Sequence, residues 1–124
     1  MVSCSRRILL VDDHVDTVNA MARLLHLTGF EVQTATSYAG AMKLCEDDNP
    51  FDLLISDVGL PDGSGYDLMR AVMDRHCATK GIAVSGYGEE TDVEQSLRAG
   101  FSAHLIKPVP FDVLRDAIQR LIPR

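Results

Sequence analysis

Five short apolar runs alternate with five longer segments of helical periodicity, and this alternation most constrains what the 124-residue chain can fold into. In the longer segments apolar residues recur every three or four positions, as on one face of an amphipathic helix. Strands that alternate with helices imply a parallel sheet with right-handed crossovers and helices on both faces. The predicted fold class is therefore α/β, a single doubly wound (βα)₅ domain, with strands over 8–11, 31–35, 53–56, 81–85 and 103–106.

The runs and the segments between them carry finer signals. Residues 8–11 are continuously apolar, which predicts a central strand covered on both faces, whereas 31–35 alternates polar and apolar residues like a strand nearer the edge. Ser37 and Ser64 are predicted N-caps, the first of a helix over 39–48. The remaining signals are helix stops at Gly29, Asn49-Pro50 and Gly100, a helix over 90–98, and a last helix over 110–122 with Pro110 in its first turn.

Composition describes an ordinary globular domain and excludes several classes of function. The net charge of −6 and pI of about 5.0 argue against direct binding to nucleic acid or to an anionic membrane. The apolar stretches are far too short to span a bilayer, so no membrane insertion is expected. Three cysteines without metal-like spacing, Cys4, Cys45 and Cys77, predict reduced thiols in a cytoplasmic protein.

Charged and hydroxyl side chains follow the apolar runs at the points where the strands end. Asp12 and Asp13 follow the first run, Asp57 follows the third, Ser85 ends the fourth and Lys107 follows the fifth. In open α/β sheets, ligands bind outside the carboxyl ends of the strands. The topology therefore predicts that these residues gather at one edge of the sheet, although they span most of the sequence.

Clustered carboxylates repel one another unless a cation compensates their charge. Asp12 or Asp13, together with Asp57 and one loop carbonyl, would supply part of the octahedral shell of hard oxygen ligands that Mg²⁺ prefers. The alternative is that the doublet only caps the following helix and favours its dipole. The presence of Asp57 at the same edge favours metal binding.

Asp57 is the candidate nucleophile, because a carboxylate that attacks phosphorus forms an acyl phosphate. The charge that spreads over the transferring oxygens needs cations in fixed positions, and Lys107 is placed to supply one beside Mg²⁺. Ser85 offers a hydroxyl donor to a phosphoryl oxygen. Taken alone, Lys107 would be interpreted as a solvated charge at a strand end and Ser85 as a helix or turn cap. The hypothesis of phosphoryl transfer to Asp57 therefore depends on all the strand-end residues together.

The ordered set of motifs resembles the receiver domain of two-component response regulators over residues 6–122. The resemblance implies a flavodoxin-like sheet of strand order 2-1-3-4-5 and Mg²⁺-dependent transfer of phosphate from a phosphohistidine to Asp57. The motifs that carry it follow one order along the chain: Asp12-Asp13, the stretch Leu-Leu-Ile-Ser-Asp-Val-Gly-Leu-Pro-Asp-Gly-Ser-Gly around Asp57, Ser85, and Lys107-Pro108.

By matching positions, the resemblance also implies individual roles. Asp13 is expected to bind the metal directly, Asp12 through water, and the backbone carbonyl of Gly59 as the third protein ligand. Ser85 and Lys107 are expected to contact the phosphate, and the Lys107-Pro108 bond is expected to be cis.

Some positions depart from the common pattern. His104 stands where receivers often carry a Tyr or Phe that changes rotamer together with the residue at the Ser85 position. A histidine can take the same place and titrates near neutrality. The alternative interpretation is that His104 is a half-buried histidine without a pH role. Gly59 and Tyr87 occupy the two variable positions beside the phosphoryl group; Gly59 brings no side chain, whereas Tyr87 would shield the site. Our hypothesis is that on phosphorylation the Ser85 loop moves inward, His104 repacks, and the face of the fourth helix, fifth strand and fifth helix changes its partner preference, with Gly86 and Gly88 as hinges.

The organisation expected is a tail or linker remnant over 1–5, the receiver domain over 6–122 and no output domain in this chain. The stretches 85–88 and 99–109 look like receivers of hybrid sensor histidine kinases, which implies the cytoplasmic portion of a membrane-bound kinase. The expected partners are a histidine kinase or a histidine phosphotransfer domain, and an output domain or protein on the face named above, with a weak homodimer as a further option.

Two other classes of protein compete with this interpretation. A Mg²⁺-dependent phosphohydrolase of small phosphoesters would also use an Asp nucleophile, but such enzymes usually place a second acid two residues later, where this chain has Gly59. They also need a cap over the substrate, for which 124 residues leave no room. The second alternative is a pseudo-receiver that only binds partners. The presence of all three acidic residues, Asp12, Asp13 and Asp57, argues against it.

Overall fold

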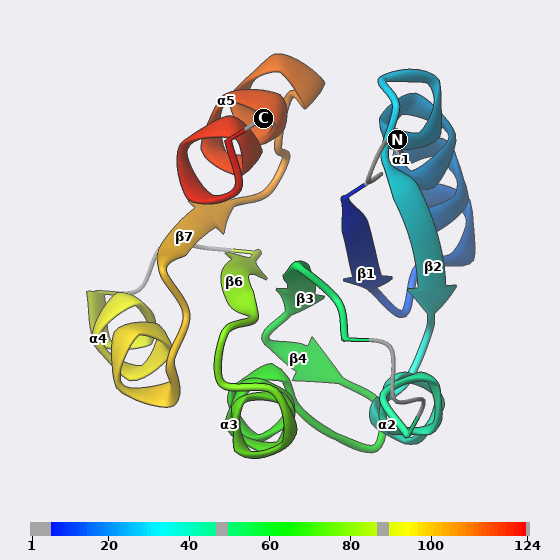
Figure 1. Cartoon of the computed structure of the whole chain (residues 1–124). Coiled ribbons are helices and arrows are strands. Elements are labelled where there is room, and N and C mark those ends of the chain that lie inside the picture. The colour runs from blue at the N-terminus through cyan, green and yellow to red at the C-terminus, as the bar shows by residue number, and fades with distance from the viewer. Residues whose placement is uncertain (1–5, 47–49, 87–89, 124) are drawn as a thin grey trace.

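A computed structural model describes residues 6–46, 50–86 and 90–123 of the chain, with side chains in 90–93 left out. Five parallel strands form one sheet in the order β2-β1-β3-β6-β7 (Figure 1). Counted along the sheet strands alone, this is the predicted order 2-1-3-4-5. The strands are β1 (Arg7–Val11), β2 (Glu31–Ala35), β3 (Leu53–Asp57), β6 (Lys80–Ser85) and β7 (Ala103–Ile106).

The helices cover the two faces of the sheet. Figure 1 shows α1 and α5 on one side and α2, α3 and α4 on the other. Side chains alternate between the faces of a strand, so Ile8 and Leu10 of β1 pack in the core under α1 and α5, whereas Leu9 and Val11 pack under α2 and α3. The helices are α1 (Val15–Leu27), α2 (Tyr38–Leu44), α3 (Gly65–Arg75), α4 (Glu90–Ala99) and α5 (Phe111–Leu121).

Most local signals in the sequence are confirmed. Ser37 accepts a hydrogen bond from the Gly40 amide at the start of α2, and Ser64 accepts one from the Tyr66 amide at the start of α3. Gly29 and Gly100 follow α1 and α4 with φ angles of 108° and 113°, the left-handed region that only glycine adopts cheaply.

The end of α2 and the start of α5 differ from prediction. α2 ends at Leu44 rather than near residue 48, because the Glu46 amide bonds to the Lys43 carbonyl and closes the last turn early. Cys45 is accordingly the C-cap of α2 and not a residue within it. Pro110 is the N-cap of α5 and precedes its first turn.

The cysteines agree with the sequence-based prediction where they are described. Cys45 is a buried free thiol and Cys77 an exposed one. Burial raises the pKa of the Cys45 thiol, against the opposing effect of the Arg75 charge. Cys4, like the whole tail over 1–5, lies outside the described residues.

A small hairpin, absent from the predicted elements, stands between β3 and α3. Its strands β4 (Gly59–Leu60) and β5 (Gly63–Ser64) pair antiparallel. Asp62 in its turn accepts hydrogen bonds from the backbone amides of Tyr38 (2.7 Å) and Ala39 (3.0 Å). These two bonds lower the pKa of Asp62 and tie the hairpin to the first turn of α2.

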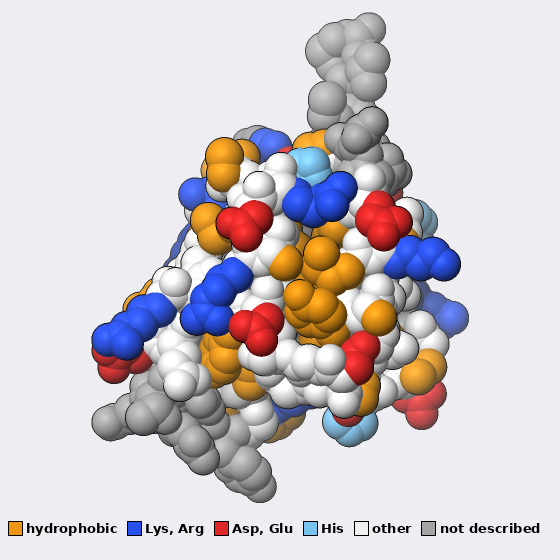
Figure 2. Space-filling model, turned by 90° about the horizontal axis from the view of Figure 1, so that it is seen from below, with side chains coloured by type: hydrophobic (Ala, Val, Ile, Leu, Met, Phe, Trp, Pro, Cys, Tyr) orange, Lys and Arg blue, Asp and Glu red, His pale blue; other side chains and the backbone are white. Residues whose placement is uncertain are grey.

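The surface over α2 and α3 mixes hydrophobic and charged side chains. Seen from this side, hydrophobic side chains form a central strip with Lys, Arg, Asp and Glu side chains around it (Figure 2). Partly buried hydrophobic residues of α2, the hairpin and α3, including Tyr38, Met42 and Tyr66, pack against the core below. Among the described segments, no helix combines the length and the hydrophobicity that crossing a membrane requires.

Candidate functional site

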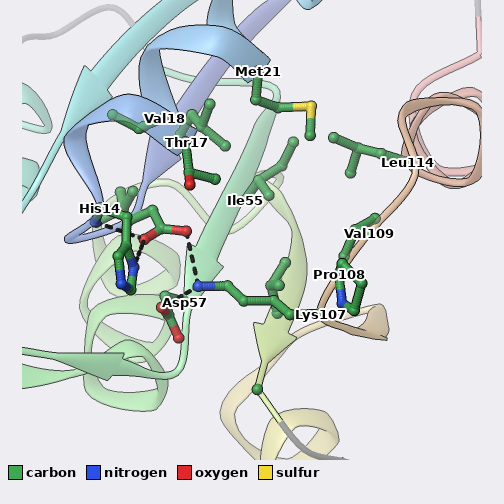
Figure 3. A pocket seen from close by; sticks show the side chains of 15 residues that line it. His14, Thr17, Val18, Met21, Ile55, Asp57, Lys107, Pro108, Val109 and Leu114 are labelled. Atoms are coloured by element: carbon green, nitrogen blue, oxygen red, sulfur yellow. Dashed lines mark hydrogen bonds and ion pairs between the residues drawn. The ribbon is translucent and has the colours of Figure 1, made fainter.

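Three of the predicted residues meet in direct contact at the carboxyl ends of the strands. The ammonium Nζ of Lys107 lies 2.8 Å from Oδ2 of Asp57 and 3.0 Å from Oδ2 of Asp12. Lys107 follows β7, Asp57 ends β3 and Asp12 follows β1, so residues from three strands share one charge centre (Figure 3). The predicted gathering at this edge is thus confirmed for these three residues.

Asp12 is the most buried of the three residues of the charge centre, with 7% of its surface exposed. Burial acts to raise its pKa, but the hydrogen bond from the His14 amide (2.9 Å) and the pairing with Lys107 outweigh this, so the pKa of Asp12 falls below its ordinary value. For Lys107, burial acts to lower the pKa, and the hydrogen bonds and charges of Asp57 and Asp12 more than reverse it. Both groups are therefore held in their charged forms.

The Asp12–Lys107 pairing gives a pH-dependent contribution to stability. The lowered pKa of Asp12 stabilises the fold at pH values above the ordinary 3.8, and this contribution is lost as pH falls through the lower folded value. The raised pKa of Lys107 stabilises the fold below the ordinary 10.5, and that contribution is lost as pH rises through the higher folded value. The charge centre therefore stabilises the protein across the neutral range and fails at both extremes.

Lys107→Gln is expected to reduce the free energy of unfolding at pH 7 by about 1–3 kcal/mol, because it leaves buried carboxylates without their charged partner. The difference from the wild type should shrink as the pH falls below 3.8 and through the lowered pKa of Asp12, because Asp12 then loses the charge that pairs with Lys107. Urea unfolding followed by circular dichroism at several pH values measures the reduction in the free energy of unfolding and its dependence on pH. A difference that stays constant with pH would show that packing of the lysine stem, and not its charge, is responsible.

Asp57 is held from two sides. Its Oδ2 accepts the hydrogen bond from Lys107, and its Oδ1 lies 3.2 Å from the backbone amide of Gly59, which donates to it. Its side chain is 12% exposed, so the carboxylate is sheltered but open to solvent on one side. The Val58 amide bonds to the Val84 carbonyl (3.0 Å) and carries the β3–β6 pairing up to the site.

Asp13 and His14 form the outer part of the acidic cluster. His14 Nδ1 lies 3.2 Å from Oδ1 of both Asp12 and Asp13, and the three residues place ligand atoms within 4.8 Å of one another. Asp12 also accepts the amide of His14, the N-cap of α1, so it supports the turn that leads into α1 as well as the charge centre. Asp13 is the more exposed carboxylate, at 42% of its side chain.

Ser85 lies at the same edge of the sheet, but its hydroxyl bonds to His104. Ser85 is 2% exposed, and its hydroxyl forms a 2.7 Å hydrogen bond with Nε2 of His104. The Ser85 carbonyl accepts the backbone amide of Lys107 (2.7 Å). His104 is half-buried, and its Nδ1 bonds to the hydroxyl of Ser96 at 2.9 Å. Ser96 was not among the predicted site residues. Its one signal in the sequence is the spacing of three residues from Ala99 in the same helical segment, and the structure buries both on the side of α4 that faces the sheet.

The Lys107-Pro108 peptide bond is cis, as the resemblance implied. A cavity of about 600 Å³ opens beside the charge centre, between α1 and the segment that leads from β7 into α5. Figure 3 shows Val18 and Met21 of α1 facing Val109 and Leu114 across it, with Asp57 and Lys107 at its end. Tyr87, predicted to lie beside the site, and Gly88, a predicted hinge, lie outside the described residues.

Comparisons with known proteins agree with this geometry. Over 113 residues the chain is 33% identical to the response regulator protein PilR of Pseudomonas aeruginosa, an alignment that covers 91% of this chain and 25% of PilR. It is 29% identical to the sensor protein EvgS of Escherichia coli K12 over 114 residues, 92% of this chain and 9% of EvgS. The chain therefore spans only a small part of either protein.

Solved structures show the same fold. The crystal structure of a CheY-like response regulator receiver domain protein from Methanospirillum hungatei superimposes with a TM-score of 0.88 at 30% identity, covering 94% of this chain and 93% of that one. The family described as the response regulator receiver domain matches residues 8–119. This chain belongs to the receiver domains of response regulators, which are phosphorylated on an aspartate.

Proposed function

We propose that Asp57 is the aspartate that accepts the phosphoryl group in this receiver domain. The observation that carries the proposal is the contact of Lys107 Nζ with both Asp57 (2.8 Å) and Asp12 (3.0 Å). The ammonium lies where charge develops when a phosphoryl group joins the Asp57 carboxylate. Such fixed cations are the main protein contribution to phosphoryl transfer.

The transfer step follows from the positions of these groups. A carboxylate oxygen of Asp57 attacks phosphorus, the phosphorus–nitrogen bond of the donor phosphohistidine breaks, and the histidine nitrogen keeps the electron pair. Lys107 neutralises charge on the transferring oxygens, and the Gly59 amide, 3.2 Å from Oδ1, orients the carboxylate. Ser85 then donates its hydroxyl hydrogen to a phosphoryl oxygen.

Receiver domains in general bind Mg²⁺ at an acidic pocket, and the donor set here fits that ion. Asp12, Asp13 and Asp57 offer hard carboxylate oxygens, and the Gly59 carbonyl is the proposed backbone ligand. Asp13 is the proposed direct ligand because it is the more exposed carboxylate, whereas Asp12 already binds Lys107 and the His14 amide. When bound, the ion supplies positive charge that offsets repulsion between the carboxylates and the incoming phosphoryl group.

Receiver domains interact with histidine kinases and with output domains. We place the phosphodonor, a histidine kinase or histidine phosphotransfer domain, against α1 and the Val109 segment, because the cavity there ends at Asp57 and the donor imidazole must reach that carboxylate. The output partner belongs on the face of α4, β7 and α5, where large hydrophobic side chains are exposed on each element: Leu97 (57%), Ile106 (49%) and Val113 (44%).

The switch between these partners is proposed to run through Ser85. Phosphorylation adds charge and acceptor oxygens at Asp57, and the Ser85 hydroxyl follows them together with His104, which lies on β7 within the output face. The similarity to EvgS supports a place within a hybrid sensor kinase, on its cytoplasmic side. Amide hydrogen exchange with and without beryllofluoride tests the switch, and unchanged exchange over 85–107 would contradict it.

The central experiment uses acetyl phosphate as a small phosphodonor. The protein is incubated with acetyl phosphate and Mg²⁺, and its intact mass is measured with and without a chelator. We expect one phosphoryl adduct that depends on the metal and disappears on alkaline hydrolysis, as an acyl phosphate does. Absence of an adduct would instead support a pseudo-receiver. Rapid hydrolysis of unrelated phosphoesters would support a phosphohydrolase.

A further inference from the structure

His104 joins three elements of the fold through its two ring nitrogens. Nε2 bonds to the hydroxyl of Ser85 at the end of β6 (2.7 Å), and Nδ1 bonds to the hydroxyl of Ser96 in α4 (2.9 Å). Both serines are buried, with 2% and 0% of their surfaces exposed. The result is a continuous hydrogen-bonded chain from α4, through β7, to the hydroxyl proposed to contact the phosphoryl group.

The hydrogens available to this chain restrict its arrangement. A neutral imidazole carries one N–H, and each hydroxyl carries one hydrogen and can also accept. Two arrangements therefore satisfy both bonds in the unphosphorylated protein. In one, Nε2–H donates to Ser85 and the Ser96 hydroxyl donates to Nδ1; in the other, every direction is reversed.

Phosphorylation removes this choice. Phosphoryl oxygens only accept hydrogen bonds, so a Ser85 hydroxyl that contacts them uses its single hydrogen there. It can then only accept from His104, which requires the proton of the ring on Nε2. Nδ1 becomes an acceptor, and Ser96 is the buried donor that faces it.

We propose that Ser96 and His104 are positioning residues for Ser85: phosphorylation of Asp57 selects the Nε2–H form of His104, and Ser96 stabilises that form by donating to Nδ1. The inference rests on the proposed function of Asp57. It gives the histidine at this position a donor–acceptor role, in place of a simple change of rotamer. It also assigns a part in the phosphorylated state to α4, whose Leu97 lies next to Ser96 on the output face.

A purely structural role for Ser96 would give different results. A hydrogen bond that only fastens α4 to β7 contributes equally to the phosphorylated and unphosphorylated protein. A positioning bond contributes more to the phosphorylated state, because only there is Nδ1 obliged to accept. The difference between the two states therefore decides between the roles.

The direct test is nuclear magnetic resonance of histidine-labelled protein with Mg²⁺, with and without beryllofluoride as the phosphoryl mimic. At a pH well above the ordinary histidine pKa of about 6.5, we expect a neutral His104 ring with its proton on Nε2 in the complex. The His104→Phe variant assigns the signal among the four histidines of the chain. A proton on Nδ1 alone, or on both nitrogens, would overturn the proposal.

The second test uses variants and beryllofluoride affinity. Ser96→Ala leaves Nδ1 without its donor and is expected to weaken beryllofluoride binding about five- to tenfold, as loss of one buried hydrogen bond implies. Ser96→Thr keeps the hydroxyl and should restore most of the affinity, and Ser102→Ala, an exposed serine after α4, is the matched control. In a His104→Phe background, Ser96→Ala should have no further effect. An equal effect in both backgrounds would overturn the proposal.

These experiments separate the inference from the function on which it rests. If the wild type does not bind beryllofluoride, the proposed role of Asp57 fails and the inference fails with it. If the wild type binds beryllofluoride and is phosphorylated, but Ser96→Ala binds it equally well, only the role of Ser96 and His104 is wrong.

Discussion

Asp57→Asn is expected to abolish the phosphoryl adduct formed with acetyl phosphate and Mg²⁺. An amide oxygen is a far weaker nucleophile than a carboxylate, and its amide nitrogen cannot accept the hydrogen bond that Lys107 donates to Oδ2 at 2.8 Å. The loss should be complete within the detection limit of intact-mass spectrometry. The fold should survive, because Lys107 keeps its contact with Asp12 (3.0 Å).

Two controls make this result specific. Asp67→Asn removes an exposed carboxylate on α3 that pairs with Arg70, away from the charge centre, and should leave adduct formation unchanged. Asp13→Asn removes a proposed metal ligand while keeping the nucleophile, and should raise the Mg²⁺ concentration needed for half-maximal adduct formation. An adduct that persists in D57N would move the acceptor to another residue and contradict the proposed function.

Gly65→Ala is expected to lower the free energy of unfolding by about 1–3 kcal/mol, the usual cost of overpacking a filled site. A Cβ at Gly65, the first residue of α3, would overlap the backbone carbonyl oxygen of Asp57 and lie 2.9 Å from the Cα of Val58. Both are backbone atoms, so no side-chain rotation relieves the contact. The change should also slow phosphorylation, because relief requires the chain that carries Asp57 to move.

Gly59→Ala provides the matched comparison. A Cβ at Gly59 meets nothing within 4 Å, and the substitution should change stability by no more than about 0.5 kcal/mol. Urea unfolding followed by circular dichroism measures both variants. Alanine is the better helix former, so helix propensity alone predicts that Gly65→Ala stabilises the protein. A stabilised variant would show that α3 can shift away from β3 without cost.

Local signals predicted the elements well because they depend on residues close together in the sequence. The apolar run over 8–11 became a buried central strand, and Ser37 and Ser64 became caps through bonds to amides two or three residues away. The strand ends then placed Asp12, Asp57 and Lys107 at one edge, since the topology of a parallel sheet leaves little choice. Where prediction erred, as at the end of α2, the boundary depends on a single hydrogen bond from the Glu46 amide to the Lys43 carbonyl, which hydrophobic periodicity does not indicate.

Contacts between distant segments were not predictable in the same way. Asp62 caps α2 from 24 residues downstream of Tyr38, and nothing near Asp62 in the sequence indicates that partner. Ser96 likewise reads as an ordinary helical serine until β7 brings His104 against it. These pairings depend on how helices and loops pack across crossovers, which local periodicity does not encode.

By itself, the sequence determined the order of strands and helices and the chemistry at the strand ends, because hydrophobic periodicity decides burial and strand direction decides which ends meet. Only the tertiary structure decided how that chemistry is distributed. It placed the Lys107 ammonium between Asp12 and Asp57, so that one cation contacts two carboxylates from different strands. It also bonded both nitrogens of His104, at 2.7 and 2.9 Å. Hydrogen bonds require distances defined to tenths of an ångström, and only the packed side chains set these.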